Sequence, residues 1–245
     1  MTRLHIAHAS LQFSDTTTQW RHDTRTILGR GYHIIGGTEA GENPHWQILR
    51  QEAHGRGYVI GRYKSNWLAV HSDQVRGRVK WGHLTVADND QVVGHGHDAN
   101  YITGTFTHAD PLVGGITVMT SHYPTKGQWY HPDPSRRVNT WITRKMGRVT
   151  SRALAQMSRG RKLGFYTGDQ NLSDRVVDTF SGGPLTTCWD ELGKWPNTGH
   201  GNIDVIASFD GDTRVKCLSA RALNDKTLFL HSDHFLIEAV YEIGE

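Results

Sequence analysis

Cysteine is scarce in this sequence, with only Cys188 and Cys217 among 245 residues. Neither belongs to a CxxC motif, so the thiols supply neither a cysteine-based zinc site nor a disulfide framework. No apolar run approaches the ~18 residues of a membrane span. The first ten residues also lack the apolar core of a signal peptide. We therefore expect a cytoplasmic protein in a reducing compartment, with no membrane span.

Excess charge is also small, at +3 with a pI of about 8.9. This balance suits a polyanionic partner without requiring one. A hydrophobic fraction of 36% is too high for a disordered chain. Internal repeats and low-complexity linkers are absent, so we expect a single domain over residues 1–245. No long apolar patch indicates an obligate oligomer, so we expect a monomer without a stable protein partner.

Most of the sequence consists of short apolar or alternating segments bounded by Gly, Asn and Asp, a pattern typical of strands. Ala87–Asp90, followed by Gln91–Val93, suits a hairpin turn. The predicted strands are Leu4–Ala9, Gly57–Arg62, Trp67–His71, Arg78–Ala87, Gly115–Ser121, Leu163–Thr167, Ile203–Ser208 and Phe235–Tyr241, with a further short one at His33–Ile35.

Two segments predict helices, Gln19–Leu28 and Pro134–Ser158. In the second, Asp133 can cap the helix and an apolar face recurs at helical spacing. Arginines lie opposite that face, either as a solvated surface or as a stripe that follows phosphates. They are Arg137, Arg144, Arg148, Arg152 and Arg159. Many strands with few helices predict an α+β sandwich, two sheets packed face to face with helices outside.

The motif Gly168-Asp169-Gln170-Asn171 follows a predicted strand directly. A strand that ends in this way presents a carboxylate and a carboxamide side by side. The carboxylate can activate water, and the amide can hold a phosphate oxygen or orient the nucleophile. The same letters also suit an ordinary turn.

Two further acidic motifs follow in the C-terminal part. Asp204 lies inside an apolar strand, either buried with a neutralising partner such as a histidine, or at the strand's solvated start. In Ser232-Asp233-His234, Asp233 offers a hard oxygen ligand for Mg²⁺ or Mn²⁺, and His234 offers a proton carrier.

Upstream, Glu39 places a carboxylate just after a short strand, and His122 places an imidazole at the end of another. With these two residues the ordered set resembles the endonuclease/exonuclease/phosphatase superfamily, which includes deoxyribonuclease I. Along almost the whole chain, the matching positions are Glu39, His122, Asp169, Asn171, Asp204, Asp233 and His234. One position departs from the pattern, because Ser10 stands where the family carries Asn at the end of the first strand.

Two neighbours of Ser10 bear on that departure. Gln12 stands where some nucleases carry a further acidic ligand. His8 is a candidate substitute for the missing Asn, although a lone histidine in a strand is more often structural.

The resemblance implies a four-layer α/β/β/α sandwich of two mixed β-sheets flanked by helices. It implies a divalent cation, Mg²⁺ or Mn²⁺, bound by Glu39 and Asp233 directly or through water. Asp169 would orient or deprotonate the attacking water, which Asn171 would help to position. Asp204 would orient His234, and His122 would donate to a phosphate oxygen or to the leaving group.

The substrate class is left open by the fold and the core site. Arg136 and Arg137, with the arginine stripe, favour nucleic acid, and Trp195 and His200 are candidates to contact it, as Ser10 is. Nearby aromatic residues, Trp129, Tyr130 and Trp189, suit base stacking, a membrane interface or the rim of the core. We therefore expect a metal-dependent nuclease acting on DNA or RNA. The alternatives are a phosphatase or phosphodiesterase for a small-molecule, nucleotide or lipid phosphate, and a catalytically weakened binding module of the same fold.

Overall fold

The chain forms two six-stranded sheets in a computed structural model that describes residues 1–11, 16–40, 44–87, 99–123, 148–149, 152, 162–171, 185–198, 204–209, 215–223 and 230–244. Sheet A has the strand order β11-β12-β1-β2-β4-β3, and sheet B has the order β5-β6-β7-β8-β10-β9. Within each sheet one neighbouring pair is parallel, β1 with β2 and β7 with β8, and the other pairs are antiparallel. The mixed sheets expected from the sequence are confirmed.

The strands of sheet A are β1 (Thr2–Ser10), β2 (Ile34–Thr38), β3 (Tyr58–Tyr63), β4 (Asn66–His71), β11 (Val215–Leu223) and β12 (Leu236–Ile243). Those of sheet B are β5 (Val75–Ala87), β6 (Ala99–His108), β7 (Gly115–His122), β8 (Lys162–Asp169), β9 (Leu185–Thr187) and β10 (Asp204–Phe209). The short helices η1 (Ser72–Gln74) and α5 (Cys188–Leu192) precede β5 and follow β9. Each strand predicted from the sequence matches one of these within a few residues. The predicted turn after Ala87 lies outside the described residues.

Alternation along β1 assigns its side chains to two different cores. Leu4 and Ile6 belong to a hydrophobic cluster that also contains residues of sheet B, so they face the other sheet. Ala7 and Ala9 belong to a second cluster shared with the helices. Because successive side chains of a strand point to opposite faces, His8 and Ser10 continue the row that faces sheet B.

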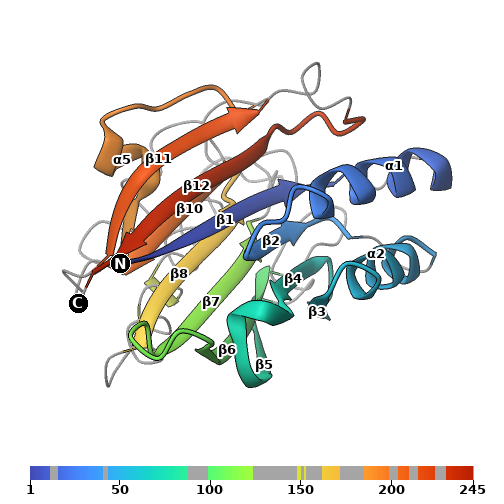
Figure 1. The fold of residues 1–245 in the computed structure, drawn as a ribbon. Helices are drawn as coiled ribbons and strands as arrows, with labels where there is room; N and C mark the ends of the chain where they lie inside the picture. The colour runs from blue at the N-terminus through green and yellow to red at the C-terminus, as the bar shows by residue number, and fades with distance from the viewer. Residues whose placement is uncertain are drawn as a thin grey trace.

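Helices α1 (Thr17–Leu28) and α2 (His45–His54) lie side by side along sheet A (Figure 1). α1, predicted from the sequence, begins at a capping box in which Thr16 and Gln19 cap each other's backbone amides. α2 is not foreseen by the sequence analysis. Its cap residue, Pro44, makes no side-chain hydrogen bond, so the usual start signal is missing.

The helix expected over residues 134–158 falls mostly outside the described residues. Arg148, Val149 and Arg152 are helical, and Val149 packs against the larger hydrophobic cluster. Both arginines are exposed, as either reading of the arginine stripe requires.

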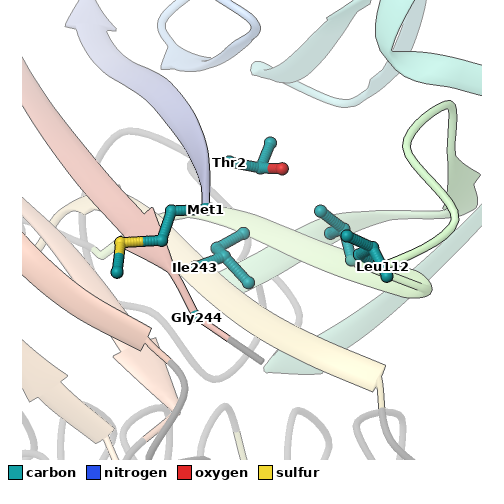
Figure 2. A pocket seen from close by; sticks show the side chains of 6 residues that line it. Met1, Thr2, Leu112, Ile243 and Gly244 are labelled. Atoms are coloured by element: carbon teal, nitrogen blue, oxygen red, sulfur yellow. The ribbon is translucent and has the colours of Figure 1, made fainter.

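The two termini meet at one end of sheet A, where Thr2 of β1 pairs with Ile243 of β12 (Figure 1). A small pocket opens there, and its lining offers no carboxylate, imidazole or thiol side chain (Figure 2). It is lined by Met1, Thr2, Leu112, Val113, Ile243 and Gly244. Ser10 lies at the opposite end of β1, far from this pocket. Among the described helices, none combines the length and apolar character needed to cross a membrane.

Candidate active site at one edge of the two sheets

Strand ends from both sheets bring the predicted site residues to one edge. In sheet B, His122 ends β7, Asp169 ends β8 and Asp204 begins β10, and the register pairs Asp169 with both of the others. In sheet A, Ser10 ends β1 beside Thr38, the last residue of β2. Parallel strands end at the same edge and an antiparallel neighbour starts there, so the polar residues at these positions converge.

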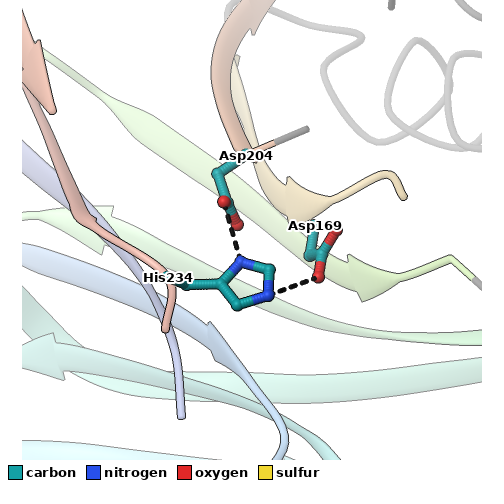
Figure 3. Close-up of side chains that lie close together, drawn as sticks. All are labelled: Asp169, Asp204 and His234. Carbon is teal, nitrogen blue, oxygen red and sulfur yellow. Dashed lines mark hydrogen bonds and ion pairs between the residues drawn. The ribbon is translucent and has the colours of Figure 1, made fainter. Parts of the chain in front are cut away.

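At the centre of this edge, His234 lies between two buried aspartates (Figure 3). Its Nδ1 is 2.9 Å from Asp204 Oδ2, and its Nε2 is 3.8 Å from Asp169 Oδ2. We assign Nδ1 as the donor to Asp204, because an ionised carboxylate only accepts. The buried aspartate thus has the histidine partner that its burial requires.

Neighbouring charges set the protonation states of these three residues. Burial raises the pKa of Asp204, but hydrogen bonding to His234 and His8 outweighs it and holds that pKa at about 2. Burial lowers the pKa of His234, yet the hydrogen bond to Asp204 and the charges of Asp204 and Asp169 raise it to about 10. Burial and the charge of Asp204 raise the pKa of Asp169 well above its ordinary value. The site therefore holds an imidazolium beside a carboxylate with strong proton affinity.

Asn171 joins β7 to β8 at the same edge. Its Nδ2 is 2.9 Å from His122 Nε2 and donates to the carbonyl of Tyr123, while its backbone amide donates to Asp169 Oδ1. His122 Nε2 also lies 3.5 Å from Asp169 Oδ2. Asn171 has φ of 49°, a left-handed conformation that Asn tolerates better than most residues. The carboxamide is thus held beside both His122 and Asp169.

Glu39 follows β2 in a left-handed conformation, with φ of 60°, that is uncommon for a glutamate. Its Oε2 accepts a hydrogen bond of 3.2 Å from the Ser10 hydroxyl, which in turn accepts one from Thr38 Oγ1. Burial raises the pKa of Glu39 to about 7, and Asp233 and Asp204 act in the same direction against the opposing charge of His234. Ser10 thus contacts the predicted metal ligand directly, although it is not the asparagine expected there.

The loop that carries Asp233 is fastened at two points. Buried Asp23 of α1 accepts hydrogen bonds from the backbone amide of His231 and lies 2.8 Å from its ring. Ser232 Oγ donates to the carbonyl of Ser10 and accepts from the amide of His234. Asp233 itself is 41% exposed, with Oδ1 4.0 Å from His234 Nε2. Its carboxylate therefore remains accessible beside the buried residues.

The donor set at this edge fits a divalent cation. Buried carboxylates raise one another's pKa, as Glu39 and Asp169 show, and a cation would offset that repulsion. Carboxylate oxygens are the ligands that Mg²⁺ and Mn²⁺ prefer. Glu39 and Asp233 can supply them, and Asp169, Asp204 and His234 form a second set whose ligand atoms lie within 4.8 Å of one another.

Other predicted contacts do not join this group. Trp195 is half-buried, and its Nε1 donates to Asp190 Oδ1 rather than to a carboxylate of the site. Trp189, considered for base stacking, is fully buried, and its Nε1 donates to the carbonyl of Asp204, so the stacking role is wrong. Three predicted substrate contacts, Arg136, Arg137 and His200, lie outside the described residues, and so does Gln12, which stands where some nucleases carry an acidic ligand. The aromatic pair Trp129 and Tyr130 does as well.

Two residues near the site make contacts that were not predicted from the sequence. His8 is fully buried, and its Nε2 is 3.3 Å from Asp204 Oδ1. The alternation of β1 was the available signal, because it places His8 on the same face as Ile6 and Ser10. Asp23, which fastens the loop at His231, had no signal beyond an acidic residue on the buried side of a helix.

Comparisons with known proteins identify the fold. The sequence matches no protein-family model and no curated protein. The structure is similar to an endonuclease/exonuclease/phosphatase from Bacteroides vulgatus, with 15% identity, a TM-score of 0.72 and full coverage of both chains. It is also similar to D. rerio TDP2 complexed with single-strand DNA product, with 14% identity and a TM-score of 0.71 over 99% of this chain and 100% of that one.

A third solved structure of the same architecture is the mannosyl-6-phosphatase Bt3783 of Bacteroides thetaiotaomicron. Its identity is 14% and its TM-score 0.67, over 97% of this chain and 99% of that one. The chain therefore has the endonuclease/exonuclease/phosphatase fold, as the motifs predicted. At these identities the likeness shows the fold alone, and the chemistry must be argued from the site.

Proposed function

We propose that this protein is a divalent-metal-dependent phosphoesterase of the endonuclease/exonuclease/phosphatase family, and that its substrates are phosphodiesters of nucleic acid. The observation that carries the proposal is the row Asp204–His234–Asp169 at the sheet edge that also holds Glu39. A structural role alone does not require three buried ionisable groups in one row, because burying charges is costly. Phosphoester hydrolysis needs such groups, a proton acceptor for water beside a donor for phosphate oxygen.

Glu39 and Asp233 would hold the cation, Mg²⁺ or Mn²⁺. When bound, it would polarise the phosphate and offset the charge that develops during the reaction. Ser10 keeps the Glu39 carboxylate in place and, by donating to it, favours the ionised form that a cation binds. Because Asp233 is exposed, its carboxylate is accessible to a cation from solvent.

Asp169 would accept the proton of the attacking water. Its raised pKa makes it a stronger base than an exposed aspartate, and Asn171 orients it through the backbone amide. His234, cationic at neutral pH, would donate through Nε2 to a phosphate oxygen while Asp204 holds Nδ1. His122 would stand on the other side of Asp169 as a second donor, for a phosphate oxygen or the leaving group.

Nucleic acid is favoured as substrate by charge. The chain carries a net charge of +3. Arg148 and Arg152, two members of the arginine stripe expected from the sequence, are exposed. TDP2, of the same fold, is seen with single-strand DNA product. A sugar phosphate is the second candidate, because the similar Bt3783 is a mannosyl-6-phosphatase. A binding module without catalysis is disfavoured, since it has no need of a charged Asp–His–Asp row.

The test is a cleavage assay with supercoiled plasmid, linear duplex and single-stranded DNA, each with Mg²⁺, with Mn²⁺ and with EDTA. Asp169→Ala is the inactive control, and Asp110→Asn, at the other end of the sheets, is the matched control. Cleavage that needs metal and is lost only in Asp169→Ala supports a nuclease. Absence of cleavage with every metal contradicts it, and the same samples then go to phosphorylated sugars, nucleotides and lipids.

A further inference from the structure

His8 is a buried histidine in the middle of the strand that leads to the site. It stands between Ile6, which packs in the core between the sheets, and Ser10, which contacts Glu39. Its side chain is 0% exposed. An aliphatic residue would continue the row from Leu4 and Ile6 without burying a polar group. The imidazole must therefore be explained by what it faces.

What His8 faces is the carboxylate of Asp204. His8 Nε2 lies 3.3 Å from Oδ1, whereas His234 Nδ1 lies 2.9 Å from Oδ2. Each oxygen of Asp204 thus has its own imidazole, one from β1 of sheet A and one from the loop before β12. A carboxylate held on one side alone can rotate about its last side-chain bond, and a second contact restrains that rotation.

The burial of His8 disfavours a purely structural role. In the part of the chain that the structure describes, neither of its ring nitrogens makes a hydrogen bond of ordinary geometry, and Nε2 makes only the 3.3 Å contact with Asp204 Oδ1. A buried nitrogen without a partner destabilises the fold. The contact of Nε2 with Asp204 is therefore made at the expense of stability, a pattern more common at functional sites than in cores.

We infer that His8 is a positioning residue for the proposed reaction, which holds Oδ1 of Asp204 so that Oδ2 keeps the His234 ring aimed at Asp169. It touches neither substrate nor cation and acts through Asp204. The inference rests on the proposed function for its kinetic consequences, whereas its structural consequence, a fixed His234 ring, does not need catalysis. The low pKa of Asp204, to which His8 contributes, agrees with it.

The kinetic test compares two substitutions at this position. His8→Leu fills similar space without a donor, and His8→Gln keeps an N–H near the place of Nε2. We expect kcat at saturating metal to fall about 10–100-fold in His8→Leu, as when outer partners of site residues are removed. KM should stay within about twofold, because ground-state binding is not touched. His8→Gln should recover most of the rate.

Stability separates this role from a structural one. His8→Leu should unfold at the same temperature as the wild type or higher, since it removes an unpartnered buried nitrogen. His5→Leu, the same change on an exposed residue of the same strand, should leave kcat unchanged. In an Asp204→Asn background, His8→Leu should change kcat by less than about twofold, because coupled residues are not additive.

Three kinetic results would overturn the inference: His8→Leu with wild-type kcat, His8→Gln as slow as His8→Leu, or an undiminished effect of His8→Leu in Asp204→Asn. A readout without substrate is the ¹⁵N spectrum of the His234 ring. It should show a protonated, ordered Nδ1 in the wild type and a shifted, broadened signal in His8→Leu. An identical signal in both also overturns the inference. If the wild type cleaves no phosphoester, the proposed function fails, and this spectrum still decides the role of His8.

Discussion

The two ends of the sheets each gather histidines, but in opposite electrostatic settings. At the site edge, His234 faces Asp204 and Asp169, and its pKa rises to about 10. At the other end, where β1 begins, burial and then the charges of His5, His108 and His71 lower the pKa of His33 to about 4. Burial lowers the pKa in both cases.

Because burial lowers the pKa at both positions, the opposite shifts of the two imidazoles come from their charged neighbours. His33 is surrounded by other imidazoles, and a proton on one disfavours a proton on the next. His234 is surrounded by carboxylates and keeps its proton at neutral pH. The site edge therefore holds a cationic donor, whereas His33 at the other end stays neutral at pH 7. Equivalent substitutions at the two ends should have unequal effects.

The largest effect is expected from replacing one aspartate at each end. Asp169→Asn should lower kcat for metal-dependent phosphoester hydrolysis by about 10³-fold, because it removes the proton acceptor. Asp110→Asn, beside His108 at the other end, should leave kcat unchanged. Initial rates with Mg²⁺ and Mn²⁺ measure both. Equal losses in the two variants would mean that Asp169 acts through stability, which thermal unfolding of each would reveal.

A smaller effect is expected from removing the charge that keeps His234 protonated. Asp204→Asn should lower kcat about 10²-fold and bring the pKa of His234 from about 10 toward its usual 6.5. NMR titration of the His234 ring measures that pKa directly.

The raised pKa of His234 also predicts how the stability of the fold depends on pH. The raised pKa of His234 stabilises the folded state fully below about pH 6.5, and this contribution is lost as pH rises through about 10. Asp204→Asn should remove that dependence on alkaline pH. A His234 pKa near 10 in the variant would show that Asp204 is not its cause.

Removing the Ser10 hydroxyl, which donates to the Glu39 carboxylate, is expected to weaken metal binding about tenfold. Ser10→Ala removes the donor to Glu39, whose pKa then rises further above about 7, so protons compete better with the cation. The apparent Kd for Mn²⁺ should rise about tenfold. Thr2→Ala, which removes a similar bond to Asp110 at the other end, should not change it. Calorimetric titration with Mn²⁺ compares the two, and equal Kd values in Ser10→Ala and wild type would exclude Ser10 from the metal site.

The smallest effect belongs to His33. Its lowered pKa means that the unfolded chain binds the proton more readily, so stability should fall as pH drops from about 6.5 to about 4 and level off below that. His33→Gln should reduce that fall by about 1 kcal/mol, a modest figure because the ring is partly exposed to screening solvent. Urea unfolding at pH 7 and pH 4.5 measures the fall in the free energy of unfolding. An equal fall in His33→Gln and the wild type would contradict the lowered pKa.

Many of the strands and helix α1 were predicted correctly from the sequence. Alternation and short apolar runs marked β1, β3, β4, β5, β7, β8, β10 and β12, and the stop signals Gly29 and Gly31 marked the end of α1. Helix α2 was missed, because its cap residue, Pro44, makes no side-chain hydrogen bond to the first turn that begins at His45. The burial of Trp189 could not be predicted either, because the local sequence does not indicate whether an aromatic side chain is exposed or buried. In the structure the side chain is buried and its Nε1 donates to the carbonyl of Asp204.

By itself, the sequence determined which residues could take part in the chemistry, because a carboxylate or an imidazole directly after a strand is bound to lie at a sheet edge. Tertiary structure alone decided how they act on one another. His8, Asp204 and His234 are far apart in the chain, and only the packing of sheet A on sheet B brings a nitrogen of each histidine within 3.3 Å of the Asp204 carboxylate. The proton affinity of a buried group depends on such neighbours, and local sequence does not contain them.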